Sequence, residues 1–443
     1  MSMAVDGLIS GLDTTALINS LMTLEAGPQT LLKSKVTTAN TLVTGLQALN
    51  SSIASLATLA TESTVANALD LYTASSSSTG VTTTASSTAS AGSIDIVVDR
   101  LAQTQVSVSD TVTEWAVSDF TITSASGTVT TIAADSTSLD DVVTAVNASE
   151  AGVSAVKVAA GADANGNALY RLQFTSAEPG ADAGFTVDNA TLTTIKTAQD
   201  AQVTLWSGTT AAQSISSSSN TFAELLPGVA VTVTAASDVP VTITVTSDDD
   251  AVSAIAEGLV SSLNAIFAQI STKTAVVNST DSSGAAIVSA GIFSGDTTVR
   301  AAQQLLISAA SMPVDGRSPS EIGISITKSG TLEFDAEKFA AAMAEDPDYV
   351  KSVLTEIATR VAGAAESASD KYDGLLTSKI TGQESLVKSL GTQIDSWDLR
   401  LTSRRSSLER TYASLEVQLS NMNAQSAWLT AQVESLNASK SSS

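Results

Sequence analysis

The sequence predicts an α+β multidomain protein in which paired N- and C-terminal α-helices, acting as coiled-coil legs, enclose nested β-rich domains. Three observations support this fold class. A heptad repeat of apolar residues runs from Ile380 to Leu436, a matching stripe runs from Leu42 to Leu56, and alternating strand patterns occupy residues 94–246 between them. Helix, then strand, then helix again is the order expected when one domain is inserted into another.

The C-terminal stripe is the strongest of these signals. Every seventh residue is apolar, at Ile380, Val387, Ile394, Leu401, Leu408, Leu415, Met422, Leu429 and Leu436. A repeat kept this strictly predicts one long helix with a narrow contact seam. At 1.5 Å per residue, that helix is roughly 85 Å long.

The N-terminal stripe follows steps of four and three residues, at Leu42, Leu46, Leu49, Ile53 and Leu56. Neither stripe can bury itself alone, because long isolated helices are marginal in water. The simplest arrangement pairs the two ends of the chain. We therefore expect a seam that joins these five residues to Ile394, Leu401, Leu408, Leu415, Met422, Leu429 and Leu436.

Two helices are expected before the β-rich region. Asp13 can cap a short helix whose apolar face consists of Leu17, Ile18, Leu21 and Leu24. Gly27 and Pro28 end it, and Pro28 opens a second helix that runs to about residue 66. Residues 74–92 are rich in Ser and Thr, which indicates a linker or a frayed edge segment.

Strand patterns dominate from residue 94 to residue 246. Alternating apolar residues predict strands, and Asn165-Gly166 between two of them is a strong hairpin signal. Helical periodicity returns at 251 and again at 297–311, followed by a hairpin around Ser329-Gly330. The predicted domains are 1–40 with 405–443, 41–73 with 251–404, 74–112 with 202–250, and an inserted module at 113–201.

Composition excludes several classes of chemistry. The 443 residues contain no cysteine and no histidine, which excludes disulfides, thiolate sites, Ser-His-Asp triads and HExxH zinc sites. The net charge of −24 lies in residues 1–350, and such an acidic surface repels nucleic-acid phosphates. No apolar run approaches a membrane span. We expect no enzyme activity, no cofactor, no metal, no nucleic-acid binding and no membrane insertion.

Three polar groups have a structural and a functional interpretation. Asp248-Asp249-Asp250 could bind calcium, but the triplet also directly precedes a helix, where carboxylates favour the positive end of the dipole. Asp163 to Asn167 resembles the start of a calcium loop, but Phe174 stands where an EF-hand needs its bidentate Glu. Arg404-Arg405 are either solvated charges or a register device at a helix interface.

Ordered motifs along the chain resemble the family of flagellar hook-associated protein 2. The N-terminal signature lies within residues 7–28, with Gln29 and Asn19-Ser20 as departures from the family pattern. Later segments that match are Leu226-Pro227-Gly228-Val229 and Gly295-Asp296-Thr297. The N-terminal signature residues are Gly7, Ser10, Gly11, Leu12, Asp13, Leu21, Met22, Glu25 and Pro28.

The resemblance implies a filament cap at the tip of the bacterial flagellum. Such a protein is a homo-oligomer, usually a pentamer, that retains exported flagellin and promotes its folding and insertion by binding and confinement. The resemblance also implies an extracellular location, type III export without a cleaved signal peptide, and contacts with hook-associated junction proteins and an export chaperone on the C-terminal helix. The alternatives are another axial protein, such as a junction protein or flagellin, or an adhesin whose β domains bind host glycans.

Overall fold

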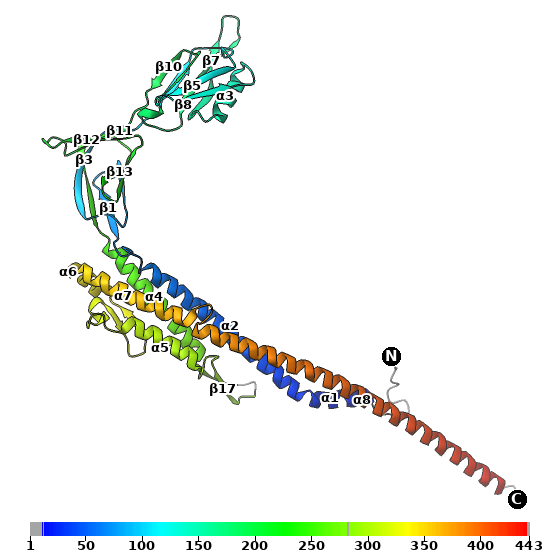
Figure 1. Cartoon of the computed structure of the whole chain (residues 1–443). Helices are drawn as coiled ribbons and strands as arrows, with labels where there is room; N and C mark the ends of the chain where they lie inside the picture. Colours follow the sequence, from blue (N-terminus) through cyan, green and yellow to red (C-terminus); the bar gives the residue numbers. More distant parts are fainter. Residues whose placement is uncertain (1–10, 12, 281–282, 441–443) are drawn as a thin grey trace. The chain divides into compact units, whose positions relative to one another are not determined.

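The structure is a computed structural model that describes residues 11, 13–280 and 283–440 of the chain. It divides into two compact units. The helical unit comprises Met1–Thr64 and Ala256–Ser443, and the β-rich unit comprises Val65–Ile255. The predicted fold class is confirmed, because terminal helices flank β-rich domains inserted between them (Figure 1).

The helical unit is built from long helices that lie side by side (Figure 1). Their bounds are α1 Thr14–Glu25, α2 Gly27–Glu62, α4 Asp249–Thr274, α5 Thr297–Ser311, α6 Ala336–Glu345, α7 Pro347–Ser369 and α8 Leu375–Lys440. The predicted C-terminal helix is thus one continuous helix of 66 residues. The Asp13 side chain accepts a hydrogen bond from Ala16 N at 2.7 Å, as predicted for the cap of α1.

The core of the helical unit forms where α2 packs along α7 and α8. Leu46, Leu49 and Ile53 of α2 are fully buried, and α7 contributes a buried face that is partly alanine. Small side chains allow the helix backbones to approach closely and fill the interface without voids. Gly45 also allows close packing, because a Cβ at this position would lie 2.4 Å from Ile292 Cδ1.

A tight corner joins α7 to α8. Asp370 Oδ1 accepts hydrogen bonds from the backbone N–H groups of Tyr372 and Asp373, each at 2.7 Å. These bonds, that from Asp373 foremost, lower the pKa of the Asp370 carboxyl. Gly374 follows, where a Cβ would lie 2.6 Å from the backbone N and O of Asp370. The corner therefore requires glycine at this position.

The helical unit also carries two hairpins. One pairs β18 Ile324–Ile326 with β19 Leu332–Phe334, as the sequence predicted around Ser329-Gly330. The other pairs β16 Val276–Thr280 with β17 Ala286–Ala290 and was not predicted. The side chains of both of its strands are exposed on both faces. A strand exposed on both faces lacks the alternation of apolar and polar residues that marks a half-buried strand.

The β-rich unit contains two hydrophobic cores. The first lies between a five-stranded sheet, in the order β1-β15-β3-β11-β12, and a three-stranded sheet, β13-β14-β2. The strands are β1 Tyr72–Ser76, β2 Val81–Ala85, β3 Gly92–Arg100, β11 Ala201–Leu205, β12 Gln213–Ser217, β13 Thr221–Leu226, β14 Val229–Val233 and β15 Ser237–Ser247. Of the two interpretations of residues 74–92, the linker is wrong and the edge segment is confirmed, since β1 and β2 are edge strands of their sheets.

The second core packs α3 Leu139–Ala148 with a four-stranded sheet, β10-β4-β8-β7, and a three-stranded sheet, β6-β5-β9. Trp115 lies between Phe120 and Phe174, with ring centroids 5.8 Å away in both cases. The strands are β4 Val106–Ser109, β5 Asp119–Ser124, β6 Val129–Ala133, β7 Val153–Ala162, β8 Ala168–Ser176, β9 Phe185–Val187 and β10 Leu192–Lys196. The two cores suit the two predicted β domains, whose boundaries stay predictions.

Two helices are long and apolar enough, by length and composition alone, to cross a membrane. They are α2 and α4, whose most apolar 18-residue windows have mean hydropathies of 1.2 and 1.5. These values are averages over a window, whereas the sequence-based expectation concerned continuous apolar runs, so the expectation of no membrane insertion stays a prediction. Both helices nevertheless place buried apolar residues in the core of the helical unit, among them Leu49 and Leu263. Core helices of soluble proteins pass the same test.

Candidate functional site: the terminal helices

The candidate site is the terminal helical pair, made of α1, the first half of α2, and α8 from about residue 384 onward; we call it the leg. Polar contacts establish that α8 runs antiparallel to α2 and α1. Residue numbers fall along α1 and α2 as they rise along α8. The contacts are Gln47 to Glu384 at 3.2 Å, Gln29 to Asp398 at 2.5 Å, Glu25 to Arg404 at 2.9 Å, and Asn19 to Arg405.

This register shows where the N-terminal stripe packs. Leu46, Leu49, Ile53 and Leu56 are buried, and Leu42 is half-buried. The Gln47–Glu384 contact places this stripe beside the first turns of α8, and α2 also packs on α7. The two predicted stripes are therefore offset along the leg. The stripe at Leu42–Leu56 does not face Ile394 to Leu436, because a heptad pattern does not identify its own partner.

The middle of the α8 stripe packs against α1 and the start of α2. Ile394, Leu401 and Leu408 are half-buried there. On the other side of the contact, Ile18 of α1 is buried, and Leu21 and Met22 are half-buried. These apolar contacts are modest in number, so polar contacts set the register of α1 on α8.

The signature residues of the N-terminal segment take structural roles where the structure describes them. Asp13 caps α1, Glu25 forms the ion pair with Arg404, and Pro28 lies in the first turn of α2. Gly11 is exposed with φ +68°, a left-handed conformation that favours glycine. Gly7, Ser10 and Leu12 lie outside the described residues.

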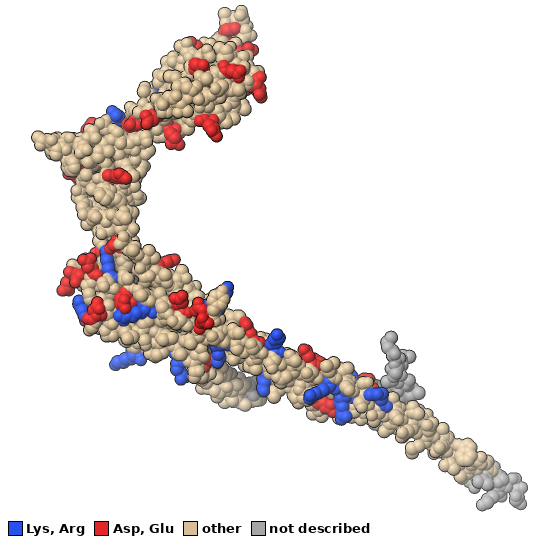
Figure 2. Space-filling view, viewed as in Figure 1, with Lys and Arg blue, Asp and Glu red and all other residues tan. Residues whose placement is uncertain are grey.

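The end of α8 is exposed. Leu415, Met422 and Leu429 of the predicted seam are 41%, 63% and 56% exposed, and Trp428 is 63% exposed. Every described side chain from Asn421 to Ser435 is exposed, and the side chain of Leu436 lies outside the described part. No charged residue occurs from Val417 to Val433, and Figure 2 shows this stretch of the leg without blue or red atoms.

Two contacts of the leg were missed by the sequence interpretation. Gln29, noted only as a departure from the family pattern, is 5% exposed and donates to Asp398. Asn19, the other departure, accepts a hydrogen bond from Arg405. Both unusual residues therefore have polar partners on α8. For Gln29 the departure itself was the available signal, because a polar residue at an apolar position needs a partner when it is buried.

Arg404 and Arg405 form the register contacts between α8 and α1. We expect Arg404→Ala combined with Arg405→Ala to lower hydrogen-exchange protection in α1. The change in the free energy of unfolding should be about 1 kcal/mol or less for each pair, because partly exposed pairs contribute little. The control is Arg410→Ala, whose Nε donates within its own helix to Ser406 O at 3.2 Å. Equal protection of α1 in both variants would contradict the register role.

Of the two acidic groups with a calcium interpretation, one caps a helix and the other holds a hairpin turn. Asp248 Oδ1 accepts from Ala251 N at 3.0 Å, at the start of α4. Asp163 Oδ1 accepts from the backbone N–H groups of Asn165 and Asn167 at 2.8 Å. Hydrogen bonds from Asn167, its side-chain amide first, lower the pKa of Asp163. Among the described residues, no group of three or more acidic side chains gathers to hold a metal ion.

Taken together, a pair of terminal helices with an exposed apolar end and β domains inserted in the chain between them defines a structural protein that acts through its surfaces. Comparison with known proteins agrees with this class. Residues 198–424 match the family described as flagellar hook-associated protein 2 C-terminus, and residues 10–105 match its N-terminus. The chain belongs to the flagellar hook-associated protein 2 family, which is a family of structural flagellar cap proteins.

Relatives cover nearly the whole chain. The flagellar hook-associated protein 2 of Escherichia coli O157:H7 is 27% identical over 98% of both chains, and that of Escherichia coli strain K12 is 26% identical over the same shares. The D1-D2-D3 domains of the flagellar cap protein FliD from Escherichia coli superpose with a TM-score of 0.61. That match is 24% identical and covers 76% of this chain and 99% of the other, so it shows a shared fold.

Proposed function

We propose that this chain forms the cap at the tip of the flagellar filament, outside the cell, as a homo-oligomer with five copies. The cap retains exported flagellin and promotes its folding and insertion by binding and confinement, with no bond made or broken. Membership of the cap family supports the cap role. The exposed apolar end of α8 is the observation that carries the finer proposal.

The physical argument starts from the uncovered stripe. Leu415, Met422 and Leu429 present an apolar seam to solvent on a helix with no charge from Val417 to Val433. Exposed apolar patches of this kind mark interaction surfaces. A charge-free helix of this pattern suits packing against other apolar helices, as helix-in-groove contacts do. If the chain caps the filament, the apolar end of α8 packs against the helices of the flagellin subunits at the filament end.

Self-association is the second part of the proposal. The chain carries a net charge of −24, and Figure 2 shows acidic side chains spread over the β-rich unit. Crowding several copies of such a unit would set like charges near each other. We therefore infer that the helical unit holds the oligomer together, with the β-rich units contributing less.

A flagellin-release assay tests this function. Cells lacking the chain should export flagellin into the medium and carry few filaments, and re-expression of the chain should reverse both effects. Flagellin in the medium and filaments on cells are measured together by immunoblot and electron microscopy. Normal filaments on cells that lack the chain would contradict the proposal.

A further inference from the structure

The unpredicted hairpin of β16 and β17 is a projecting apolar surface on the helical unit. Val276, Val277, Ile287 and Val288 are 56%, 58%, 42% and 68% exposed. Opposite residues in the ladder share a face, so Val276 and Val288 lie on one face and Val277 and Ile287 on the other. A lone two-stranded hairpin is marginally stable in water. Apolar side chains on both of its faces indicate that a partner covers it.

The base of this hairpin is anchored firmly in the helical unit. Gly291 N donates to Ala275 O and Phe293 N donates to Lys273 O, both at 2.9 Å. Phe293 is 1% exposed, and Ile292 packs against α2 at Gly45. A Cβ at Gly291 would lie 2.2 Å from Lys273 O, so the two strands leave α4 and α5 through a close backbone contact. The hairpin is thus presented from a fixed base.

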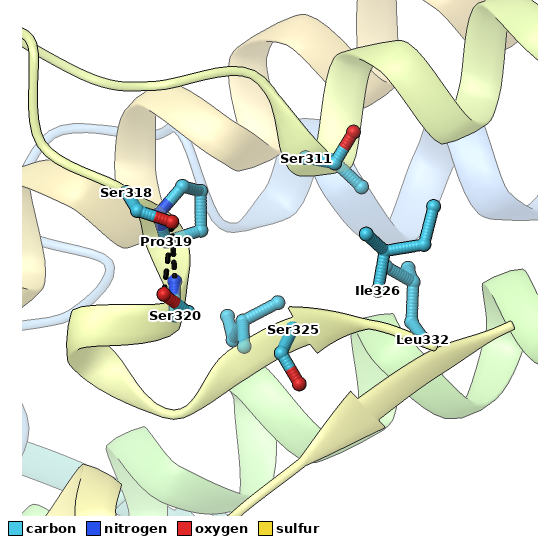
Figure 3. Close-up of a pocket in the computed structure, with 9 residues that line it drawn as sticks. Ser311, Ser318, Pro319, Ser320, Ser325, Ile326 and Leu332 are labelled. Atoms are coloured by element: carbon cyan, nitrogen blue, oxygen red, sulfur yellow. Dashed lines mark hydrogen bonds between the residues drawn. The ribbon is translucent and has the colours of Figure 1, made fainter. Parts of the chain in front are cut away.

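A small pocket opens on the same unit, at the other end of α5. It has a volume of about 260 Å³ and is lined by Ala310, Ser311, Ser318, Pro319, Ser320, Ile324, Ser325, Ile326 and Leu332 (Figure 3). Ala310, Pro319, Ile324 and Leu332 are buried, whereas Ile326 on the rim is 46% exposed. Pockets for small molecules are usually larger, so this volume suits one or two aliphatic side chains.

Three of the four serines that line this pocket already form hydrogen bonds within the chain. The Ser311 hydroxyl donates to Ile307 O at 2.7 Å. Ser318 Oγ lies 2.9 Å from Ser320 Oγ and accepts from Ser320 N, as the dashed lines in Figure 3 show. Ile326 and Leu332 lie in the space between the β18–β19 hairpin, which carries them, and α5 (Figure 3). The pocket therefore favours an apolar occupant.

The absence of charged residues from both surfaces favours a second copy of this acidic chain as the partner. The described strands of the β16–β17 hairpin contain no charged residue, and neither does the lining of the pocket. Arg317, next to the pocket, pairs with Glu321 at 2.8 Å. In a chain of net charge −24, these are surfaces on which two copies can meet without setting like charges together or burying an unpaired charge.

We propose that the β16–β17 hairpin of one copy docks Val276 and Val288, the exposed valines of one face, in the Ser311–Ile326 pocket of the next copy. This inference rests on the proposed homo-oligomeric cap and names the contact that builds it. The two surfaces differ and lie at opposite ends of α5, a 15-residue helix about 22 Å long. Such a contact is heterologous, so its repetition closes a ring when the rotation allows it.

Because the chain contains no cysteine, introduced thiols report this contact cleanly. Two single variants are made in the full chain, Val288→Cys on the hairpin and Ser311→Cys at the pocket. They are mixed and treated with a short bismaleimide cross-linker. We expect a covalent dimer in the mixture, and a ladder of oligomers when both substitutions are in one chain. The matched control is Val239→Cys, a 70% exposed strand valine in the β-rich unit, mixed with Ser311→Cys.

A second measurement keeps the test independent of thiol chemistry. Val288→Asp should weaken self-association in analytical ultracentrifugation by about tenfold or more, since docking would bury a carboxylate. Val239→Asp should leave self-association unchanged.

The outcomes of these experiments distinguish failure of the hairpin contact from failure of the proposed homo-oligomer. Self-association of the wild type without a Val288–Ser311 cross-link, or with Val288→Asp unaffected, overturns the hairpin contact but leaves the cap function standing. A wild-type chain that stays monomeric at every concentration overturns the homo-oligomer as well. Cross-linking of Val288→Cys to added flagellin, and not to a second copy, would assign the hairpin to flagellin and also overturn the inference.

Discussion

Leu429→Asp should abolish retention of flagellin while leaving the isolated chain as stable as the wild type. Leu429 is 56% exposed in the single chain, and exposed substitutions usually change the free energy of unfolding by about 0.5 kcal/mol or less. In the assembled cap the same position would be covered by apolar helices. A buried, unpaired carboxylate there costs several kcal/mol, which corresponds to about a hundredfold or more in affinity.

The measurement is the amount of flagellin in the culture medium, with thermal unfolding of the purified variant beside it. Ala431→Asp is the matched control, because it adds the same charge to an exposed position on the opposite face of the same helix. We expect this variant to retain flagellin better than Leu429→Asp does. Normal filaments with Leu429→Asp would refute a role for the α8 seam in assembly.

Leu46→Ala should have the largest effect on stability. Leu46 is fully buried in the core between α2 and its neighbours, and a Leu→Ala change in such a site costs about 2–5 kcal/mol. The helical unit should therefore unfold at a lower denaturant concentration. The β-rich unit has its own cores, so its unfolding transition should not move.

Leu31→Ala is the control for this variant, because Leu31 lies on the same helix and is 59% exposed. Tryptophan fluorescence separates the two units, since Trp115 lies in the second β core and Trp397 on α8. If Leu46→Ala shifts both unfolding transitions equally, the two units unfold together. That result would contradict the expectation that their cores are independent.

The sequence predicted the parts of the fold that depend on periodicity and on caps. The heptad stripe predicted one continuous helix, and α8 runs without a break through Ile380, Leu408 and Leu429. Asp13 and Asp248 were predicted as caps, and both accept hydrogen bonds from the helix that follows. These signals are local, so a single chain is enough to find them.

The parts that the sequence did not predict depend on partners distant in the chain. The stripe at Leu42–Leu56 packs beside the start of α8 and against α7, which a heptad pattern does not specify. At residues 74–92 the sequence left a linker and an edge segment open, because Thr suits a strand as well as a loop, and the structure forms edge strands there. The β16–β17 hairpin has no buried face, so it leaves no periodic trace.

The candidate site was predicted in part. The apolar α8 residues and the Arg404-Arg405 pair were identified from the sequence, and in the structure both arginines donate hydrogen bonds from α8 to residues of α1. The contacts of Gln29 and Asn19 with α8 were not predicted, because they join residues more than 360 positions apart. Only the register of the folded leg brings them together.

The position of the chain on the growing filament tests the central claim most directly. Val239 is 70% exposed in the β-rich unit, and the chain has no native cysteine, so Val239→Cys accepts one thiol-reactive label on intact cells. The cap proposal predicts label at the distal tip of the filament at every stage of growth. Label at the junction between hook and filament, or along the whole filament, would contradict it and would favour another axial role.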